Sequence, residues 1–173
     1  MSKLKLDFKF IEREIRNKSF GILNTINPDS NPHTTGILYG VSKPEVEFAL
    51  YLLTSMYYRK VKNIQRNENV SFVIPFPHHI FRFAPSGTIT LNGTAEVVPI
   101  NTEEIIKIFS EKRILRLIIA DINFEKEDEL IFIKLNPNPK ILCYGVGINI
   151  LKLRGSHTTG GYSVTIPVER STK

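Results

Sequence analysis

The most informative hydrophobic pattern in this chain runs from Val46 to Gln65. A nearly continuous apolar run over Val46–Leu53 predicts one buried strand, since it is long enough for a strand and shorter than an ordinary helix. The run ends at Thr54 and Ser55, whose hydroxyls can accept hydrogen bonds from the unpaired N–H groups of a first helical turn. These two residues therefore predict a helix N-cap directly after the strand.

Helical spacing follows over Tyr57–Arg66, where Val61 and Ile64 form the expected buried side. The cations left for solvent or a ligand are Arg59, Lys60, Lys62 and Arg66. Arg59 and Lys60 stand at the predicted helix start, where free N–H groups and the helix dipole favour an anion such as a phosphate. From these residues alone, a phosphate site and an ordinary solvated basic helix face are equally good interpretations.

The residues before this stretch predict a helix and a hairpin. Apolar positions at spacings of three and four indicate an amphipathic helix over Phe8–Asn17. Two apolar-rich runs, Ser19–Asn27 and Pro32–Gly40, are joined by the turn residues Pro28–Asn31, an order typical of an antiparallel hairpin. A second break at Ser42–Glu45 leads into the next strand, so a three-stranded meander is predicted.

The residues after this stretch predict further strands and another helix. Val70–Phe76 and the Thr-, Ile- and Val-rich segment Gly87–Val98 are predicted strands, with Gly93 as a bulge or a point of close approach. A helix is predicted to start at Asn101–Glu104, and its buried face is formed by Ile105, Ile108, Phe109 and Leu115. The last predicted strands are Leu130–Leu135, Ile141–Val146 and Tyr162–Pro167. The glycine-bearing loop Arg154–Gly161 lacks a phosphate-loop signature.

These elements predict a mainly β protein with added helices. Many short, closely spaced strands indicate an antiparallel barrel of six or seven strands, with helices covering its openings. The short connections exclude a doubly wound parallel sheet, which needs long crossovers.

Composition limits the function without identifying it. Of the 173 residues, 42% are hydrophobic, which is enough for one core, and the net charge of +6 favours anionic partners. The single cysteine, Cys143, stands between apolar neighbours, so we expect a buried inert thiol and neither a disulfide framework nor a thiolate zinc site. No signal-peptide core or membrane-length apolar run is present, and we expect a cytoplasmic protein without membrane association.

Two weaker patterns concern metals and nucleic acids. The histidines are His33, His78, His79 and His157. No carboxylate or cysteine stands at ligand spacing beside them, so loop or surface histidines are favoured and no metal is expected. Tyr57 and Tyr58 could stack on nucleobases, but a packed strand-to-helix corner is the more ordinary interpretation, and no nucleic-acid-binding motif is present.

Four segments, taken together, are similar to one known family. They are GILNTINPDSNPHTTGILYG, LYLLTSMYYRKVKNIQRNENVSFVIPF, ITLNGTAEVVP and LIFIKLNPNPKILCY, and they span most of residues 19–145. In this order they resemble the opening hairpin, the phosphate helix between two strands, the following strand and a late strand pair of the pyridoxamine 5'-phosphate oxidase-like, FMN-binding split-barrel proteins. The C-terminal Arg and Trp signature of the oxidases themselves is not evident, and the chain contains no Trp.

The resemblance implies a single FMN-binding, Greek-key split-barrel domain over residues 1–173, with a core at about 19–146 and a C-terminal extension at 147–173. It also implies a homodimer with two flavin sites at the interface. The implied cofactor-binding residues are Thr34, Thr35 and Gly36 along the isoalloxazine ring, Thr54 and Ser55 at the ring or ribityl end, Arg59 and Lys60 at the phosphate, and Thr88. Thr88 falls where the oxidases carry an amide side chain that reaches the partner's flavin.

The implied function is that of an oxidoreductase that passes a hydride or electrons between FMN and a small substrate or a donor such as NAD(P)H. Because the cofactor carries the redox chemistry, no catalytic side chain is singled out. The alternatives are a deazaflavin-dependent reductase, whose cofactor suits a similar cationic site, and a non-catalytic module that stores or senses flavin, haem or a nucleotide. A basic nucleic-acid binder is third.

Overall fold

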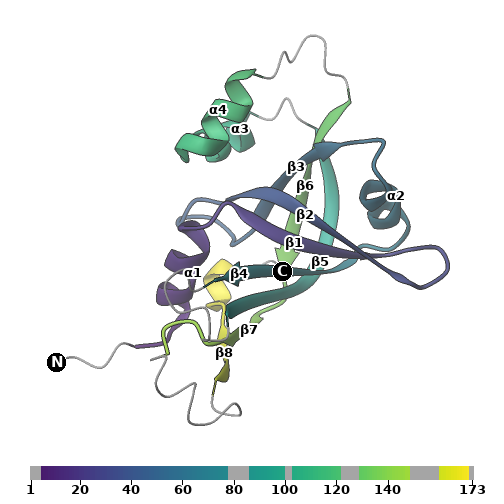
Figure 1. Ribbon diagram of the computed structural model, residues 1–173. Coiled ribbons are helices and arrows are strands. Elements are labelled where there is room, and N and C mark those ends of the chain that lie inside the picture. Colours follow the sequence, from purple (N-terminus) through teal and green to yellow (C-terminus); the bar gives the residue numbers. More distant parts are fainter. Residues whose placement is uncertain (1–4, 78–85, 100–102, 122–128, 149–159, 172–173) are drawn as a thin grey trace.

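The computed structural model describes residues 5–77, 86–99, 103–121, 129–148 and 160–171, and over these ranges it is a mainly β protein (Figure 1). The strands are β1 (Phe20–Ile26), β2 (Pro32–Val41), β3 (Leu50–Ser55), β4 (Asn69–Phe76), β5 (Gly87–Pro99), β6 (Leu130–Pro137), β7 (Lys140–Tyr144) and β8 (Gly161–Thr165). The helices are α1 (Phe8–Arg16), α2 (Arg59–Arg66), α3 (Glu103–Ser110), α4 (Arg113–Asp121) and the short 3-10 helix η2 (Val168–Arg170).

Six of the strands close into an antiparallel barrel. Their order is β4-β1-β2-β3-β6-β5, and β5 pairs back with β4 to close the ring, while β7 and β8 extend from β5. Consecutive strands β1, β2 and β3 are neighbours, so the predicted hairpin and meander are confirmed. The predicted fold class, an antiparallel barrel with flanking helices, is confirmed as well.

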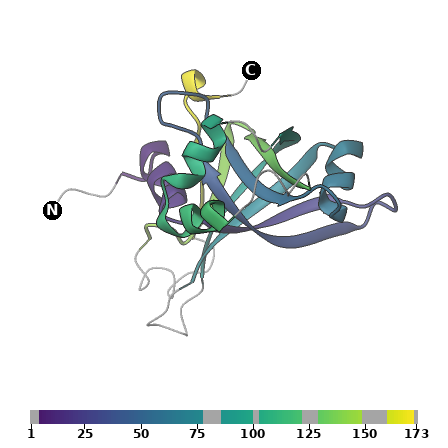
Figure 2. The ribbon, with the colours of Figure 1, turned by 90° about the horizontal axis from the view of Figure 1, so that it is seen from above.

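Helices cover two openings and one outer surface of the barrel. Ile11 of α1 and Val61 of α2 are buried with the strand side chains of the barrel core. On the outside, Phe109 of α3 and Leu115 of α4 pack with Phe132 of β6 in a second core. Figure 2 shows α3 and α4 side by side against the barrel. α3 reaches the outer face of β2 at Leu38 and Gly40, and the rest of the outer surface of the β1–β2 hairpin carries no helix among the described elements (Figures 1 and 2).

Two details that rest on single residues are confirmed. A Cβ at Gly93 would lie 2.1 Å from the carbonyl oxygen of Asn136, so this glycine permits a close approach of β5 and β6. Cys143 is buried and free, and burial raises the pKa of its thiol to about 11, so the thiol stays protonated near neutral pH.

The strand and helix boundaries around residue 50 differ from the prediction. β3 starts at Leu50 instead of Val46, because Val46 lies exposed in a turn and Phe48 donates its N–H to the carbonyl of Arg170 at 2.8 Å. The predicted N-cap at Thr54 and Ser55 is wrong. Both residues continue β3, where they pair with β6. The helix N-cap is Tyr58, which makes no side-chain capping bond.

The second helical prediction is correct in its buried residues and wrong in its continuity. Ile105, Ile108, Phe109 and Leu115 are all buried, but they belong to two helices, because the chain turns at residues 111 and 112. The predicted start at residues 101 and 102 lies outside the described residues, as do His78, His79, His157 and most of the loop 154–161.

Candidate functional site

The barrel is split between β2 and β3. These strands pair only through Tyr39–Val41 and Leu50–Leu52. Beyond that point β2 continues with β1 to the hairpin tip, whereas β3 continues with β6 to Ser55. The two strands therefore separate where the chain leads from β3 into α2, and most of the predicted cofactor residues come from this region.

Thr54 contributes a buried hydroxyl without a partner. Its side chain is at the end of β3, the residue is 5% exposed, and Oγ1 has no hydrogen-bond partner among the described residues. A buried hydroxyl that makes no hydrogen bond destabilises a fold, and such groups in native proteins usually mark a missing partner. By strand alternation Thr54 lies on the core side of β3 with Leu50 and Leu52, so a polar ligand atom would reach its hydroxyl through the split between β2 and β3.

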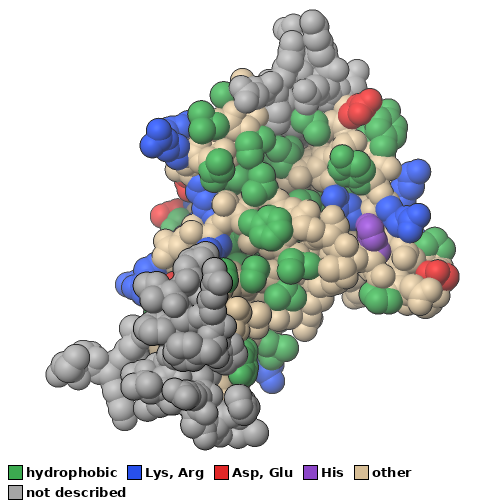
Figure 3. Space-filling model, in the orientation of Figure 1, with side chains coloured by type: hydrophobic (Ala, Val, Ile, Leu, Met, Phe, Trp, Pro, Cys, Tyr) green, Lys and Arg blue, Asp and Glu red, His purple; other side chains and the backbone are tan. Residues whose placement is uncertain are grey.

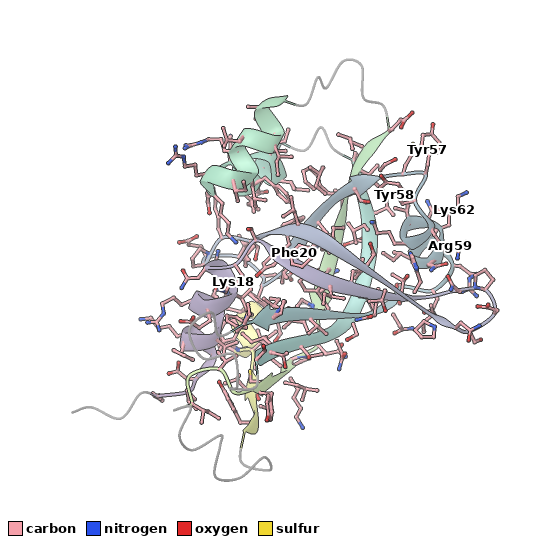
Figure 4. All side chains as sticks on the ribbon, viewed as in Figure 1. Lys18, Phe20, Tyr57, Tyr58, Arg59 and Lys62 are labelled. Atoms are coloured by element: carbon pink, nitrogen blue, oxygen red, sulfur yellow. The ribbon has the colours of Figure 1, made fainter. Side chains whose placement is uncertain are left out.

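The first turn of α2 brings two cations to the same region. Arg59 is exposed, and Figure 4 shows it beside Lys62 on α2, below Tyr57 and Tyr58. Hydrogen bonds from Asn31 lower the pKa of Asp29 at the hairpin tip, and the charge of Arg59 lowers it further. The helix start adds free N–H groups and the positive end of a dipole. The donor set fits a phosphate.

Lys60 is not available to solvent in the way the sequence pattern predicts. It is 7% exposed, and its ammonium group lies 4.7 Å from the centre of the Tyr58 ring. Burial lowers the pKa of Lys60, because removal from water penalises the charged form. An anion bound beside it would compensate for this cost and restore the pKa.

Polar contacts that were not predicted hold α2 against the hairpin. The Asn63 amide donates to Thr25 Oγ1 at 3.0 Å and to Asn27 Oδ1 at 3.1 Å, and Arg66 donates to the carbonyl of Ile26 at 2.6 Å. Asn63 and Thr25 are almost fully buried. The sequence feature that could have identified Asn63 is its position next to Ile64, on the buried side of the helix. These bonds fix the position of the cations relative to the hairpin.

Strand alternation separates the residues predicted to lie along the flavin ring. Thr34 and Gly36 pair with Asn24 and Ile22, and all four lie on the outer face of the hairpin. Thr35 lies opposite Leu23, a core residue, and so points to the other side. The outer face continues through a row that crosses four strands, namely Gly36, Ile22, Val73 and Thr90, and we call this the outer row.

Thr88 lies apart from the other predicted residues. It is on β5, on the same outer face as Thr90, and β1 and β4 stand between it and β2. With strands spaced about 4.8 Å apart, β5 and β2 are about 14 Å apart across the sheet, and Thr88 lies two residues along β5 from the row of Gly36. One flat ring on Gly36 therefore cannot be covered by Thr88 of the same chain.

Three of the predicted cofactor residues, Thr34, Gly36 and Arg59, are exposed on open surface. Two hollows lie nearby: one of about 580 Å³ between Ile64–Asn69 and Ala95–Val97, and one of about 330 Å³ beside Asn24, Ser71 and Asn92. Neither is lined by Thr54, Arg59 or Lys60. Figure 3 shows apolar side chains across the centre of the β1–β2 face and basic side chains near α2. A second surface is needed to enclose a ligand here.

In the described part of the chain, no group of three or more His, Cys, Asp or Glu side chains could hold a metal ion, and His33 lies half-buried in β2. No described helix has the length and apolar character that crossing a bilayer requires.

No protein-family model matches the sequence, and no curated protein matches it. Solved structures do match. HutZ, the heme storage protein from Vibrio cholerae, is 17% identical with a TM-score of 0.58, over 79% of this chain and 94% of that chain. A candidate pyridoxamine 5'-phosphate oxidase from Listeria innocua is 18% identical with a TM-score of 0.57, over 77% and 94%. An FAD-binding protein from Mesorhizobium loti is 16% identical with a TM-score of 0.53, over 79% and 90%.

These similarities establish the fold. The chain has the split-barrel architecture of proteins that include flavin-binding and heme-binding members, so the predicted resemblance is confirmed at this level. At such low identity, they carry no residue roles.

Proposed function

We propose that this protein is an FMN-binding flavoprotein whose cofactor lies at the split between β2 and β3. The observation that carries the proposal is the combination of Arg59 and Lys60 at the start of α2 with the unpartnered, buried hydroxyl of Thr54. Two cations suit a dianionic phosphate, and the hydroxyl suits the ribityl chain or the ring. FMN contains all of these groups.

In this proposal each group of the chain has one task. Arg59 and Lys60 bind the phosphate, and Asn63 and Arg66 position them by holding α2 against the hairpin. Thr34 and Gly36 offer a strand surface for the ring on the outer face of the hairpin. Bound flavin supplies hydride or electron transfer, and the protein orients it and limits its contact with water. An oxidoreductase acting on a small substrate or NAD(P)H is the activity that follows.

A homodimer completes the proposed site. Thr88 is too far from Gly36 to cover the same ring within one chain, whereas a two-fold axis across the outer row can bring Thr88 of a second copy over Gly36. The apolar members of that row, Ile22 and Val73, are available for such an interface.

The first test is the absorbance spectrum of the protein as purified, followed by mass spectrometry of whatever heat releases. FMN gives a band near about 450 nm, whereas an oxidised deazaflavin absorbs nearer about 420 nm and haem shows its own strong band. Because a heme storage protein shares the fold, a haem spectrum would replace the proposal with a haem-binding function.

The second test is a pair of double variants. Changing Arg59 and Lys60 to Ala should weaken FMN binding by about 2–4 kcal/mol, a rise in Kd of about 30- to 1000-fold, because charged hydrogen bonds to the phosphate are lost. The matched control changes Lys9 and Arg116, which are exposed on α1 and α4, to Ala. It removes the same charge and should leave the Kd unchanged. Equal Kd values for the two double variants would mean that the phosphate binds elsewhere.

A further inference from the structure

Phe20 is an exposed aromatic side chain next to the proposed ring surface. It is the first residue of β1 and is 49% exposed, whereas Phe48, Phe72 and Phe109 are buried. Its pairing with Leu38 places it on the outer face of the hairpin, on the same side as Gly36. Figure 4 shows it in the middle of this face, at a distance from the tyrosines and cations of α2.

The Phe20 ring lies diagonally over Gly36. A Cβ at Gly36 would be 2.7 Å from Phe20 Cζ and 2.8 Å from Cε2, so the edge of the ring occupies the space that a side chain at this position would need. Gly36 nevertheless stays exposed, and no described aromatic ring packs against Phe20. A flat ligand that rests on Gly36 must therefore meet Phe20.

Polarity changes along the hairpin on this face. Phe20 and Leu38 form an apolar pair, followed by Ile22 with Gly36 and then by Asn24 with Thr34. The Thr34 hydroxyl donates to Asn24 Oδ1 at 2.7 Å, which leaves the Thr34 oxygen and one Asn24 N–H for a ligand. The isoalloxazine system has the same asymmetry, with an apolar benzenoid end and a hydrogen-bonding pyrimidine end.

We propose that Phe20 is a ring-contact residue that packs against the benzenoid end of the flavin, while the Asn24–Thr34 pair faces its pyrimidine end. This assignment rests on the proposed function. It adds a specificity-determining residue that the sequence pattern did not identify, and it fixes which end of the ring lies towards α3 and α4, where Leu38 joins the second core.

The absence of tryptophan from the chain permits a direct test. In F20W, position 20 carries the single tryptophan of the protein, and its emission should be largely lost when flavin-free protein is saturated with FMN, because stacked flavin quenches indole fluorescence. The matched control is V168W, placed at a residue that is 90% exposed on η2, away from the β1–β2 hairpin (Figure 2). The tryptophan emission of V168W should fall only by the amount that dissolved FMN absorbs.

The Kd for FMN and the oligomeric state of two further variants provide a second readout. Removing the ring in F20A should raise the Kd for FMN about tenfold, as expected for one lost aromatic contact. F20L keeps the apolar character and should lie between F20A and the unmodified protein. The oligomeric state of all three should be the same.

The outcomes separate the two proposals. Tight FMN binding with equal quenching in F20W and V168W would overturn the role of Phe20 and leave the proposed function intact. Loss of FMN binding in F20A together with a change in oligomeric state would assign Phe20 to the subunit interface. That result would also overturn its role as a ring-contact residue. Absence of FMN binding in the unmodified protein would overturn both proposals.

Discussion

At the residue scale, the candidate site depends on burial that a linear pattern does not reveal. Arg59 and Lys60 are equivalent as sequence letters, yet one is exposed and the other is buried beside Tyr58. Thr54 is likewise an ordinary polar residue in the sequence and an unpartnered buried hydroxyl in the fold. Burying the Lys60 ammonium and the Thr54 hydroxyl costs free energy, and a ligand would reduce that cost. A bound anion would stabilise the charge of Lys60, and a hydrogen bond would satisfy Thr54.

A Thr54→Val variant should separate folding from binding. Valine has nearly the shape of threonine, so replacing an unpaired hydroxyl should leave the free energy of unfolding of the flavin-free protein unchanged or raise it by up to about 1 kcal/mol. The Kd for FMN should rise about tenfold, because a hydrogen bond to the ligand is lost. Urea unfolding and a fluorescence titration measure the two effects.

Thr25→Val is the matched control for that variant. Thr25 is also a buried threonine, but its Oγ1 accepts a hydrogen bond from Asn63 at 3.0 Å. Its replacement should destabilise the fold by about 1–3 kcal/mol, since the Asn63 amide loses a partner. If the two variants lost equal stability without flavin, Thr54 would have a partner in the protein and its role as a ligand contact would be untenable.

At the scale of elements, the sequence predicts strands and helices well where local chemistry determines them. The hairpin follows from its turn residues Pro28–Asn31, and α1 follows from its apolar spacing. The structure adds the Asp7 N-cap, which accepts the N–H of Phe10 at 3.0 Å. The N-cap at Thr54 was predicted wrongly because pairing with β6 extends β3 by two residues, a contact more than seventy positions away in the chain. Likewise, local spacing cannot show that Asn63 bonds to the hairpin.

A set of long-range polar contacts also fixes the C-terminal element. Arg170 of η2 donates to Glu12 Oε1 at 3.1 Å and to the carbonyl oxygens of Val46 at 2.5 Å and Lys43 at 3.3 Å. Glu12 also accepts from Arg16 at 2.6 Å. These bonds tie η2, α1 and the loop before β3 together, which explains why that strand begins later than its apolar run predicts.

An Arg170→Ala variant should therefore be clearly destabilised. The loss should be about 2–4 kcal/mol in the free energy of unfolding, because a mostly buried carboxylate loses one partner and two carbonyls lose their donor. The control is Arg13→Ala, which removes an exposed pair with Glu14 and should change stability by less than about 0.5 kcal/mol. Urea unfolding compares them, and similar midpoints would show that η2 contributes nothing to the stability of the barrel.

At the scale of the whole molecule, the outer row lies on a surface that no described helix covers. α1 and α2 close the barrel openings, and α3 and α4 cover the outside near β3 and β6. The outer face of β1, of β4 and of β2 up to Gly36 carries Ile22, Val73 and the exposed Phe20 without a described helix over it. Exposed apolar surface of this kind favours association, and the separation of Thr88 from Gly36 favours a second copy of this chain as the occupant.

An Ile22→Glu variant tests this arrangement, because Ile22 lies in the outer row between Gly36 and Val73. A two-fold interface would bury two copies of the new carboxylate without partners, so the dimer should dissociate, while the barrel core on the opposite side of β1 is untouched. Leu117→Glu, at an exposed apolar residue of α4, should leave the assembly unchanged. Light scattering during size-exclusion chromatography gives the mass, and circular dichroism confirms the fold. A folded I22E monomer that has lost FMN affinity would link assembly to the cofactor site, whereas a dimeric I22E protein would place the interface on another face.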